Sequence, residues 1–175
     1  IQVRETHLGP IINDNRIDPE TGAPRGWNNE DPLVLRWTGL DTGTLFKSVV
    51  MLNTAQNWEQ FREALRYWNV PAQNFIFADV DGNIGYQTPG SMPIRPGDRD
   101  GLVPTLATSD ADVWQGYIPF DLLPRIYNPD RDWIATANQA VVPLNTMSSW
   151  RKNWATRTST CSAMTGHTVI AGSAS

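Results

Sequence analysis

The stretch Asn74–Tyr86 constrains the fold of this chain more than any other part of its sequence. An apolar run over Phe75–Ala78 leads into the pair Asp81-Gly82, and a second run follows that ends at Tyr86. Asp-Gly pairs favour the positive backbone φ that a tight turn between antiparallel strands requires. The pattern therefore predicts a β-hairpin over residues 74–87.

A helix is predicted directly before this hairpin, over residues 57–68. Asn57 suits the N-cap position, Glu59 lies near the positive end of the helix, and Val70-Pro71 stops it. The apolar side chains expected on one face are Trp58, Phe61, Leu65 and Trp68.

The remaining elements are shorter and separated by loops rich in Pro, Gly, Asn and Asp. They comprise one or two strands in residues 1–12, a loop over 13–32, a strand at Leu33–Trp37 ended by Thr38-Gly39, a helix over 44–52 closed by Asn53 or Thr54, a loop over 89–104, and irregular structure packed on a sheet over 114–138.

Composition excludes several classes of function. With 175 residues, 40% of them hydrophobic and 18% charged, the chain is a globular domain or a piece of one. A net charge of −4 provides no basic surface for nucleic acid, and no apolar run approaches the roughly 20 residues that span a bilayer. We therefore expect neither nucleic acid nor a membrane as a partner. A single cysteine excludes an internal disulfide.

The side chains that bind metals are too scattered to predict a zinc centre. His7, His167 and Cys161 lie far apart in the sequence and have no partners at ligand spacing. Asp79, Asp81 and Asn83 alternate in the manner of a calcium loop, but no bidentate glutamate follows at the required spacing. A polar hairpin turn is the favoured interpretation of these three residues.

Asn138, in the run Ile134–Gln139, is the one polar residue with a specific chemical interpretation. An asparagine amide held among small neighbours can donate a hydrogen bond to a developing oxyanion. The alternative is an asparagine that caps a strand end or turn. The spacing by itself favours the capping role.

Several motifs in order along residues 1–145 resemble the penicillin acylase family. They are Arg4-x-Thr6-His7-x-Gly9-Pro10, Leu35-Arg36-Trp37-Thr38, Asn57-Trp58-x-x-Phe61, the hairpin Asn74–Tyr86, Gly116-x-Ile118-Pro119-Phe120, Asn128-Pro129 and Ile134–Asn138. Each motif is weak alone, and their shared order carries the resemblance.

The resemblance implies a segment of the β-subunit of an N-terminal-nucleophile amide hydrolase. The fold it implies is an α+β fold, a partial four-layer α-β-β-α sandwich, with the rest of an α/β acylase heterodimer as partner. Such enzymes transfer the acyl group of a linear, non-peptide amide to an N-terminal Ser, Thr or Cys and then to water. That nucleophile lies upstream of the matched motifs, so we expect this segment alone to be inactive and poorly stable.

The resemblance also implies a role for Asn138, a class of substrate, a cellular location and the cofactor requirement. It aligns Asn138 with the asparagine that helps to form the oxyanion hole, although Gln139 stands where relatives carry a second asparagine. It implies a small-molecule substrate, either a β-lactam side-chain amide or an N-acyl homoserine lactone, and a periplasmic or secreted location. No cofactor is expected in the segment; a structural calcium belongs to the parent enzyme, and no ligand for it is assigned here.

Residues 146–175 depart from the family pattern. Ser and Thr become dense and apolar periodicity disappears, which is typical of a disordered terminus. A second hypothesis is a frameshift near residues 143–146, because Met164-Thr165 re-read in a shifted frame encodes the Asp that opens a family motif.

Two alternatives to the acylase segment remain at this point. The eight tryptophans of the chain are compatible with a non-catalytic β-type module that binds carbohydrate or aromatic ligands, provided that several lie exposed on one face. Against this, Trp58 and Trp68 share the apolar helix face, and Trp37 ends a strand that we expect to be buried. The other alternative is an inactive pseudogene product.

Overall fold

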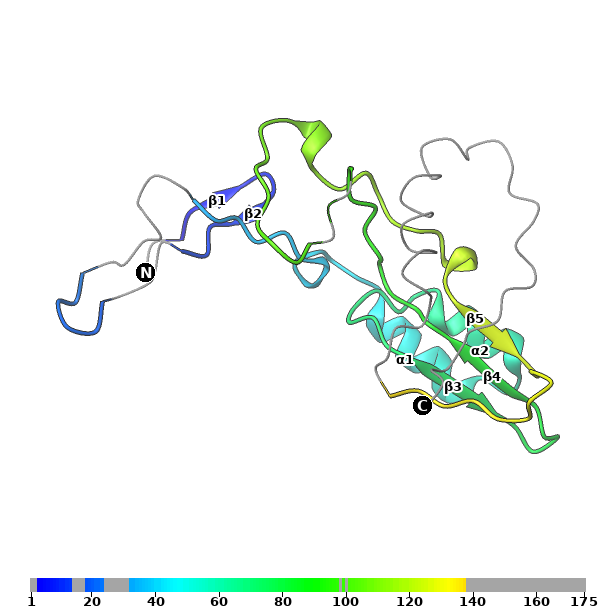
Figure 1. The fold of residues 1–175 in the computed structure, drawn as a ribbon. Coiled ribbons are helices and arrows are strands. Elements are labelled where there is room, and N and C mark those ends of the chain that lie inside the picture. Colours follow the sequence, from blue (N-terminus) through cyan, green and yellow to red (C-terminus); the bar gives the residue numbers. More distant parts are fainter. Residues whose placement is uncertain (1–2, 14–17, 24–31, 98, 100, 138–175) are drawn as a thin grey trace, which may run out of the picture. The chain divides into compact units, whose positions relative to one another are not determined.

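The fold is seen in a computed structural model that describes residues 3–13, 18–23, 32–97, 99 and 101–137 (Figure 1). The chain divides into two units, one of residues 1–42 with 101–106 and the other of residues 43–100 with 107–175. Each unit is described by itself. In the described ranges, no helix combines the length and apolarity that crossing a membrane demands.

The second unit is built on a three-stranded antiparallel sheet in the order β3-β4-β5. β3 (Phe75–Ala78) and β4 (Ile84–Gln87) form the predicted hairpin, and β5 (Arg125–Tyr127) pairs with the other edge of β4. The hairpin prediction is confirmed. The third strand was expected only as irregular structure, because three residues are too few to show an alternating pattern.

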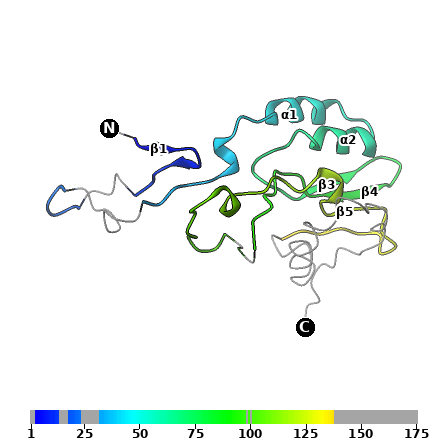
Figure 2. The same ribbon diagram turned by 90° about the horizontal axis from the view of Figure 1, so that it is seen from above.

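Two helices precede the sheet and lie on one side of it (Figure 2). α1 (Leu45–Thr54) matches the helix expected over 44–52 and ends at Thr54. α2 (Trp58–Leu65) begins as predicted, since the Asn57 side chain accepts a hydrogen bond from the backbone N–H of Gln60.

The end of α2 comes three residues earlier than the predicted end at residue 68. After Leu65 the backbone N–H groups of Tyr67 and Trp68 donate to carbonyls three residues back, so the last turn tightens out of α-helical geometry. Trp68 leaves the helical face and packs edge-on against Phe75, while its indole N–H donates to the Pro71 carbonyl.

An aromatic layer joins α2 to the sheet. Trp58 stacks on Phe61 and on Tyr127, and it also contacts Phe77 of β3. The register aligns Phe77, Gly85 and Tyr127 across the three strands, so these residues share the sheet face toward α2. A Cβ on Gly85 would lie 2.5 Å from the Trp58 ring, so glycine is what lets the indole approach β4.

The opposite face of this sheet is also apolar. Ile76, Tyr86 and Ile126 align across the strands, and Ala78 pairs with Ile84. Tyr86 is buried, its hydroxyl is hydrogen-bonded to Asn74 and Thr88, and burial raises the pKa of its phenol. Ile76 is 45% exposed. The sheet thus carries apolar side chains on both faces.

The first unit consists of short backbone pairings with little burial. β1 (Glu5–Thr6) and β2 (Gly9–Pro10) form a small hairpin, as expected for residues 1–12. The predicted strand at Leu33–Trp37 is wrong in extent: it is reduced to a single bridge between Ile11 and Val34. Trp37 is 53% exposed rather than buried, because the chain turns into a short 3₁₀ helix at Thr38–Leu40.

Candidate functional site

Asn138, the predicted oxyanion donor, lies outside the described residues, as do His167 and Cys161. The oxyanion role of Asn138 therefore stays a prediction. Residues 128–137, the stretch that precedes Asn138 directly, are described. The contacts of this stretch fix where the chain leaves the sheet before it reaches Asn138.

Asn128 fixes that exit from β5. Its backbone φ of 46° lies in the left-handed region, which asparagine tolerates better than most residues. The Asn128 N–H donates to the Ile84 carbonyl at 2.8 Å, and its Oδ1 accepts from the Ile84 N–H at 2.9 Å. Its Nδ2 donates to Asn83 Oδ1 at 2.8 Å. One side chain thereby continues the pairing of β5 with β4 and ties it to the hairpin turn.

The chain then turns again within a few residues. The N–H of Asp132 donates to the Pro129 carbonyl at 3.1 Å, and Asp132 has a φ of 54°. Arg131 places its guanidinium over the Trp133 ring, 4.6 Å from its centroid. Two left-handed residues four positions apart thus bend the backbone between β5 and the run Ile134–Ala137.

The carboxylate of Asp79 organises the hairpin turn to which the Asn128 side chain is hydrogen-bonded. Asp79 accepts hydrogen bonds from the N–H groups of Asp81 and Asn83 and from the Asn83 side-chain amide, at 2.8 to 3.0 Å. These hydrogen bonds, that of the Asn83 side chain first, lower the pKa of Asp79. The oxygens of Asp79 therefore accept hydrogen bonds within the turn, as expected for a polar hairpin turn.

A second polar cluster lies on the sheet side of α2. Arg66 makes a bidentate ion pair with Asp121, at 2.8 and 2.9 Å, and its Nε donates to Glu63. Arg62 donates to Asp121 at 3.1 Å and to the buried Gln87 at 3.1 Å. Phe120 lies beneath both guanidinium groups. The cluster fastens α2 to the short 3₁₀ helix Phe120–Leu122.

The charged groups of this cluster shift one another's pKa values to different extents. The hydrogen bond from Arg66, more than that from Arg62, lowers the pKa of Asp121. The same bond raises the pKa of Arg66. Burial and the neighbouring Arg125 lower the pKa of Arg62 despite its bond to Asp121, since a half-buried cation loses hydration.

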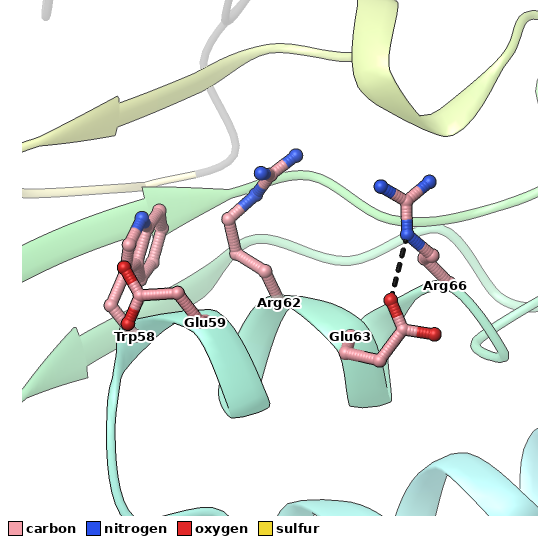
Figure 3. A pocket seen from close by; sticks show the side chains of 5 residues that line it. All are labelled: Trp58, Glu59, Arg62, Glu63 and Arg66. Atoms are coloured by element: carbon pink, nitrogen blue, oxygen red, sulfur yellow. Dashed lines mark hydrogen bonds and ion pairs between the residues drawn. The ribbon is translucent and has the colours of Figure 1, made fainter.

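A small pocket opens beside the cluster, lined by Trp58, Glu59, Arg62, Glu63 and Arg66 (Figure 3). Its volume of about 160 Å³ is below the roughly 300 Å³ at which ligand sites begin. The three nitrogens of the Arg66 guanidinium are engaged by protein carboxylates, and none of the lining side chains is a hydroxyl or thiol nucleophile. The ion pairs beside this pocket join α2 to the Phe120–Leu122 segment.

Metal ligands are equally sparse over the described ranges. No three His, Cys or carboxylate side chains there come together in a group that could hold an ion. The structural calcium expected for the parent enzyme therefore has no candidate ligand group among the described residues.

The sequence did not identify Asn128 or the Arg62–Asp121–Arg66 cluster. The Asn-Pro pair at Asn128-Pro129 signals a turn, but nothing local shows that its partner is Ile84, 44 positions earlier. The ion pairs join residues 55 and 59 positions apart, which no helical or strand spacing connects.

Comparisons with known proteins identify the relatives of this fold. The penicillin amidase family model matches residues 1–167. An acyl-homoserine lactone acylase of Pseudomonas fluorescens is 35% identical over 80% of this chain and 16% of the relative. Penicillin G acylase of Escherichia coli is 32% identical over 59% of this chain and 12% of the relative.

A solved structure agrees with these sequence relatives. The thermostable penicillin G acylase of Alcaligenes faecalis matches with a TM-score of 0.57 and 27% identity, over 81% of this chain and 24% of that one. The chain spans less than a fifth of the length of the curated relatives named above. The family predicted from the sequence motifs is confirmed. The chain belongs to the penicillin amidase family.

Proposed function

We propose that this chain is a segment of an amide hydrolase that cleaves linear, non-peptide amides by acyl transfer. The observation that carries the proposal is the family model's match over residues 1–167, together with relatives whose names are acylases. In the proposed parent, an N-terminal Ser, Thr or Cys outside the matched motifs attacks the amide carbonyl, and its own α-amine accepts the proton. The acyl group then passes to water.

Within this chain, the proposed contribution is Asn138. Its side-chain N–H₂ donates a hydrogen bond to the carbonyl oxygen as that oxygen becomes negative in the tetrahedral intermediate. The hydrogen bonds of Asn128 to Ile84 and Asn83 support the role, because they fix the backbone ten positions before Asn138. A donor placed before the reaction costs no reorganisation when the charge develops.

The proposed fold of the parent is the four-layer α-β-β-α sandwich. Here α1 and α2 lie on one side of the β3-β4-β5 sheet (Figure 2), while Ile76, Ile84 and Ile126 belong to the opposite face. A second sheet supplied by the rest of the α/β heterodimer would bury that face at the usual sheet-to-sheet spacing of about 10 Å. This chain by itself lacks the nucleophile and is inactive in the proposal.

The proposed substrate is a small amide of one of two kinds, a β-lactam side-chain amide or an N-acyl homoserine lactone. Both kinds appear in the names of the relatives. We further propose an exported parent whose structural calcium lies outside this segment. The alternative of a Trp-exposing binding module needs several exposed tryptophans on one face. Of the described tryptophans, Trp58 is buried, Trp68 and Trp114 are half-buried, and the two exposed ones, Trp37 and Trp133, belong to different units.

The first experiment is a DNA read through both flanks of the coding region. An upstream frame with a Gly-Ser, Gly-Thr or Gly-Cys junction, and family sequence downstream in a shifted frame, would support the proposal. No related sequence on either side would leave the protein without a nucleophile and favour the pseudogene alternative.

The second experiment assays the parent enzyme with both amide classes. Asn138→Ala is expected to lower kcat by about 10²- to 10³-fold, as removal of one oxyanion donor does elsewhere, with a smaller change in KM. Gln139→Ala is the matched control at the neighbouring position and should retain most of the activity. Equal activity of Asn138→Ala and the parent would remove Asn138 from the mechanism.

A further inference from the structure

The tip of the β3–β4 hairpin is exposed, and its backbone is not crowded by other atoms. Val80 and Asp81 are exposed, and a Cβ built on Gly82 would have no atom within 4 Å. Gly82 has a φ of +85°, which glycine adopts without strain. Its N–H makes one long hydrogen bond, 3.3 Å to the Asp79 carbonyl.

The two aspartates of this turn differ in their engagement. Asp79 accepts three hydrogen bonds, and the residue after it is β-branched Val80. The carboxylate of Asp81 has no hydrogen bond or ion pair within the described parts of the chain, and the residue after it is Gly82. Asp81 therefore has a carboxyl free to rotate beside an unhindered backbone nitrogen, while Asp79 has neither property.

We propose that Asp81-Gly82 is a site of spontaneous isomerisation, at which Asp81 converts to isoaspartate through a cyclic imide. The Gly82 nitrogen attacks Cγ of the protonated Asp81 carboxyl, a C–N bond forms, the C–O bond to the carboxyl hydroxyl breaks, and that hydroxyl leaves as water with the amide proton. Water then adds to one of the two ring carbonyls. Opening at the former backbone carbonyl gives isoaspartate, and opening at Cγ restores aspartate. The net mass is unchanged, and no other reactant is required.

The surrounding contacts permit this reaction and define its consequence. Moving the Gly82 nitrogen toward Cγ breaks only the 3.3 Å bond to Asp79, while the shorter bonds from the Asp81 and Asn83 N–H groups hold the ends of the turn. Isoaspartate adds one carbon to the backbone between these two ends. The product therefore displaces Asn83, whose side chain is bonded to Asn128 at 2.8 Å. The inference does not depend on the proposed hydrolase activity.

The test is long incubation of the full chain at neutral pH, followed by proteolysis and mass spectrometry with a fragmentation method that distinguishes isoaspartate. The sample is used under conditions in which the amides of β3 and β4 resist hydrogen exchange, so that the hairpin is intact. A synthetic peptide of residues 74–88 is the unstructured reference. The other Asp-Gly pair, Asp100-Gly101, is scored on its own peptide, since Asp100 lies outside the described residues.

We expect isoaspartate to accumulate at residue 81 in the folded chain and to stay at background at residue 79. Asp81→Glu should abolish the signal, because glutamate would have to close a larger, slower-forming ring. Asp81→Asn should reach the same imide faster, with loss of ammonia. Isoaspartate that appears in the peptide but not in the folded chain would overturn the proposal, as would equal conversion at residues 79 and 81.

Discussion

Each unit of this chain has a tryptophan next to a glycine, but the tryptophan is buried in one unit and exposed in the other. In the helix–sheet unit, Trp58 is 8% exposed and lies against Phe61, Phe77 and Tyr127. In the first unit, Trp37 is 53% exposed. Each indole sits close to a glycine: an added Cβ would lie 2.5 Å from Trp58 at Gly85 and 2.5 Å from Trp37 at Gly39.

The difference shows that a short contact matters only where its atoms cannot move away. Trp58 is held by rings from α2 and from two strands, so its position is fixed by the surrounding packing. Trp37 borders solvent and can rotate outward. The first unit also exposes large apolar side chains, such as Val3, Ile12 and Leu40, and of its described apolar residues only Ile11 is buried. Its short strands are held mainly by backbone pairing.

The largest expected effect comes from removing the two indoles. Trp58→Ala should lower the free energy of unfolding by about 3–5 kcal/mol, because it opens a cavity in the aromatic layer. Trp37→Ala should change it by less than about 0.5 kcal/mol. Urea unfolding monitored by circular dichroism measures both. Equal losses would mean that the two regions do not differ in packing.

Alanine substitutions at Gly85 and Gly39 test the same difference, because an added Cβ would lie 2.5 Å from an indole ring at both positions. Gly85→Ala should cost about 1–3 kcal/mol, since the new methyl group meets a ring that has no room to move. Gly39→Ala should be neutral or stabilising by up to about 1 kcal/mol, because Trp37 can swing away and the unfolded chain loses entropy. The same unfolding measurement applies, and a larger loss at Gly39 than at Gly85 would contradict the account.

The smallest expected effect is that of the ion pairs on α2. Asp121→Asn should cost no more than about 1 kcal/mol at neutral pH, because the carboxylate is largely exposed to solvent that screens it. The pKa of Asp121 is lowered in the folded state, so its contribution is present above the unfolded value near 3.9 and is lost as the pH falls through the folded value. The stabilities of Asp121→Asn and the unmodified chain should therefore converge below about pH 4. A difference that stays constant from pH 7 to pH 3 would assign the loss to packing.

Predictions from the sequence succeeded where neighbours along the chain decide the structure. Asn57 caps α2 through Gln60, and the Asp81-Gly82 pair lies in a turn held by Asp79, all within four residues. The family motifs predicted the relatives for the same reason, since each motif is read locally. Asn138 as the site residue stays a prediction, and so does the boundary of the tail at residue 146.

Predictions from the sequence failed mainly where residues far apart in the chain determine the structure. The strand β5 exists because its three residues pair with β4, some 40 positions earlier, and the exposure of Trp37 follows from a turn that ends its strand at a single bridge. The end of α2 at Leu65 is a local exception: the hydrogen bonds that tighten the chain there span three residues, and Trp68 packs on Phe75 seven positions later.

By itself, the sequence determined the hairpin, the start of α2, the turn at Asp79–Asn83 and the family to which the chain belongs. These depend on backbone conformations and hydrogen bonds that a few adjacent residues select. Only the tertiary structure decided that Gly85 admits Trp58, that Asp121 joins Arg62 of α2 to Arg66 just beyond it, and that Asn128 links β5 to the hairpin turn. Those contacts close long loops, and the loss of chain entropy on closing them is offset only when the whole aromatic layer packs at once.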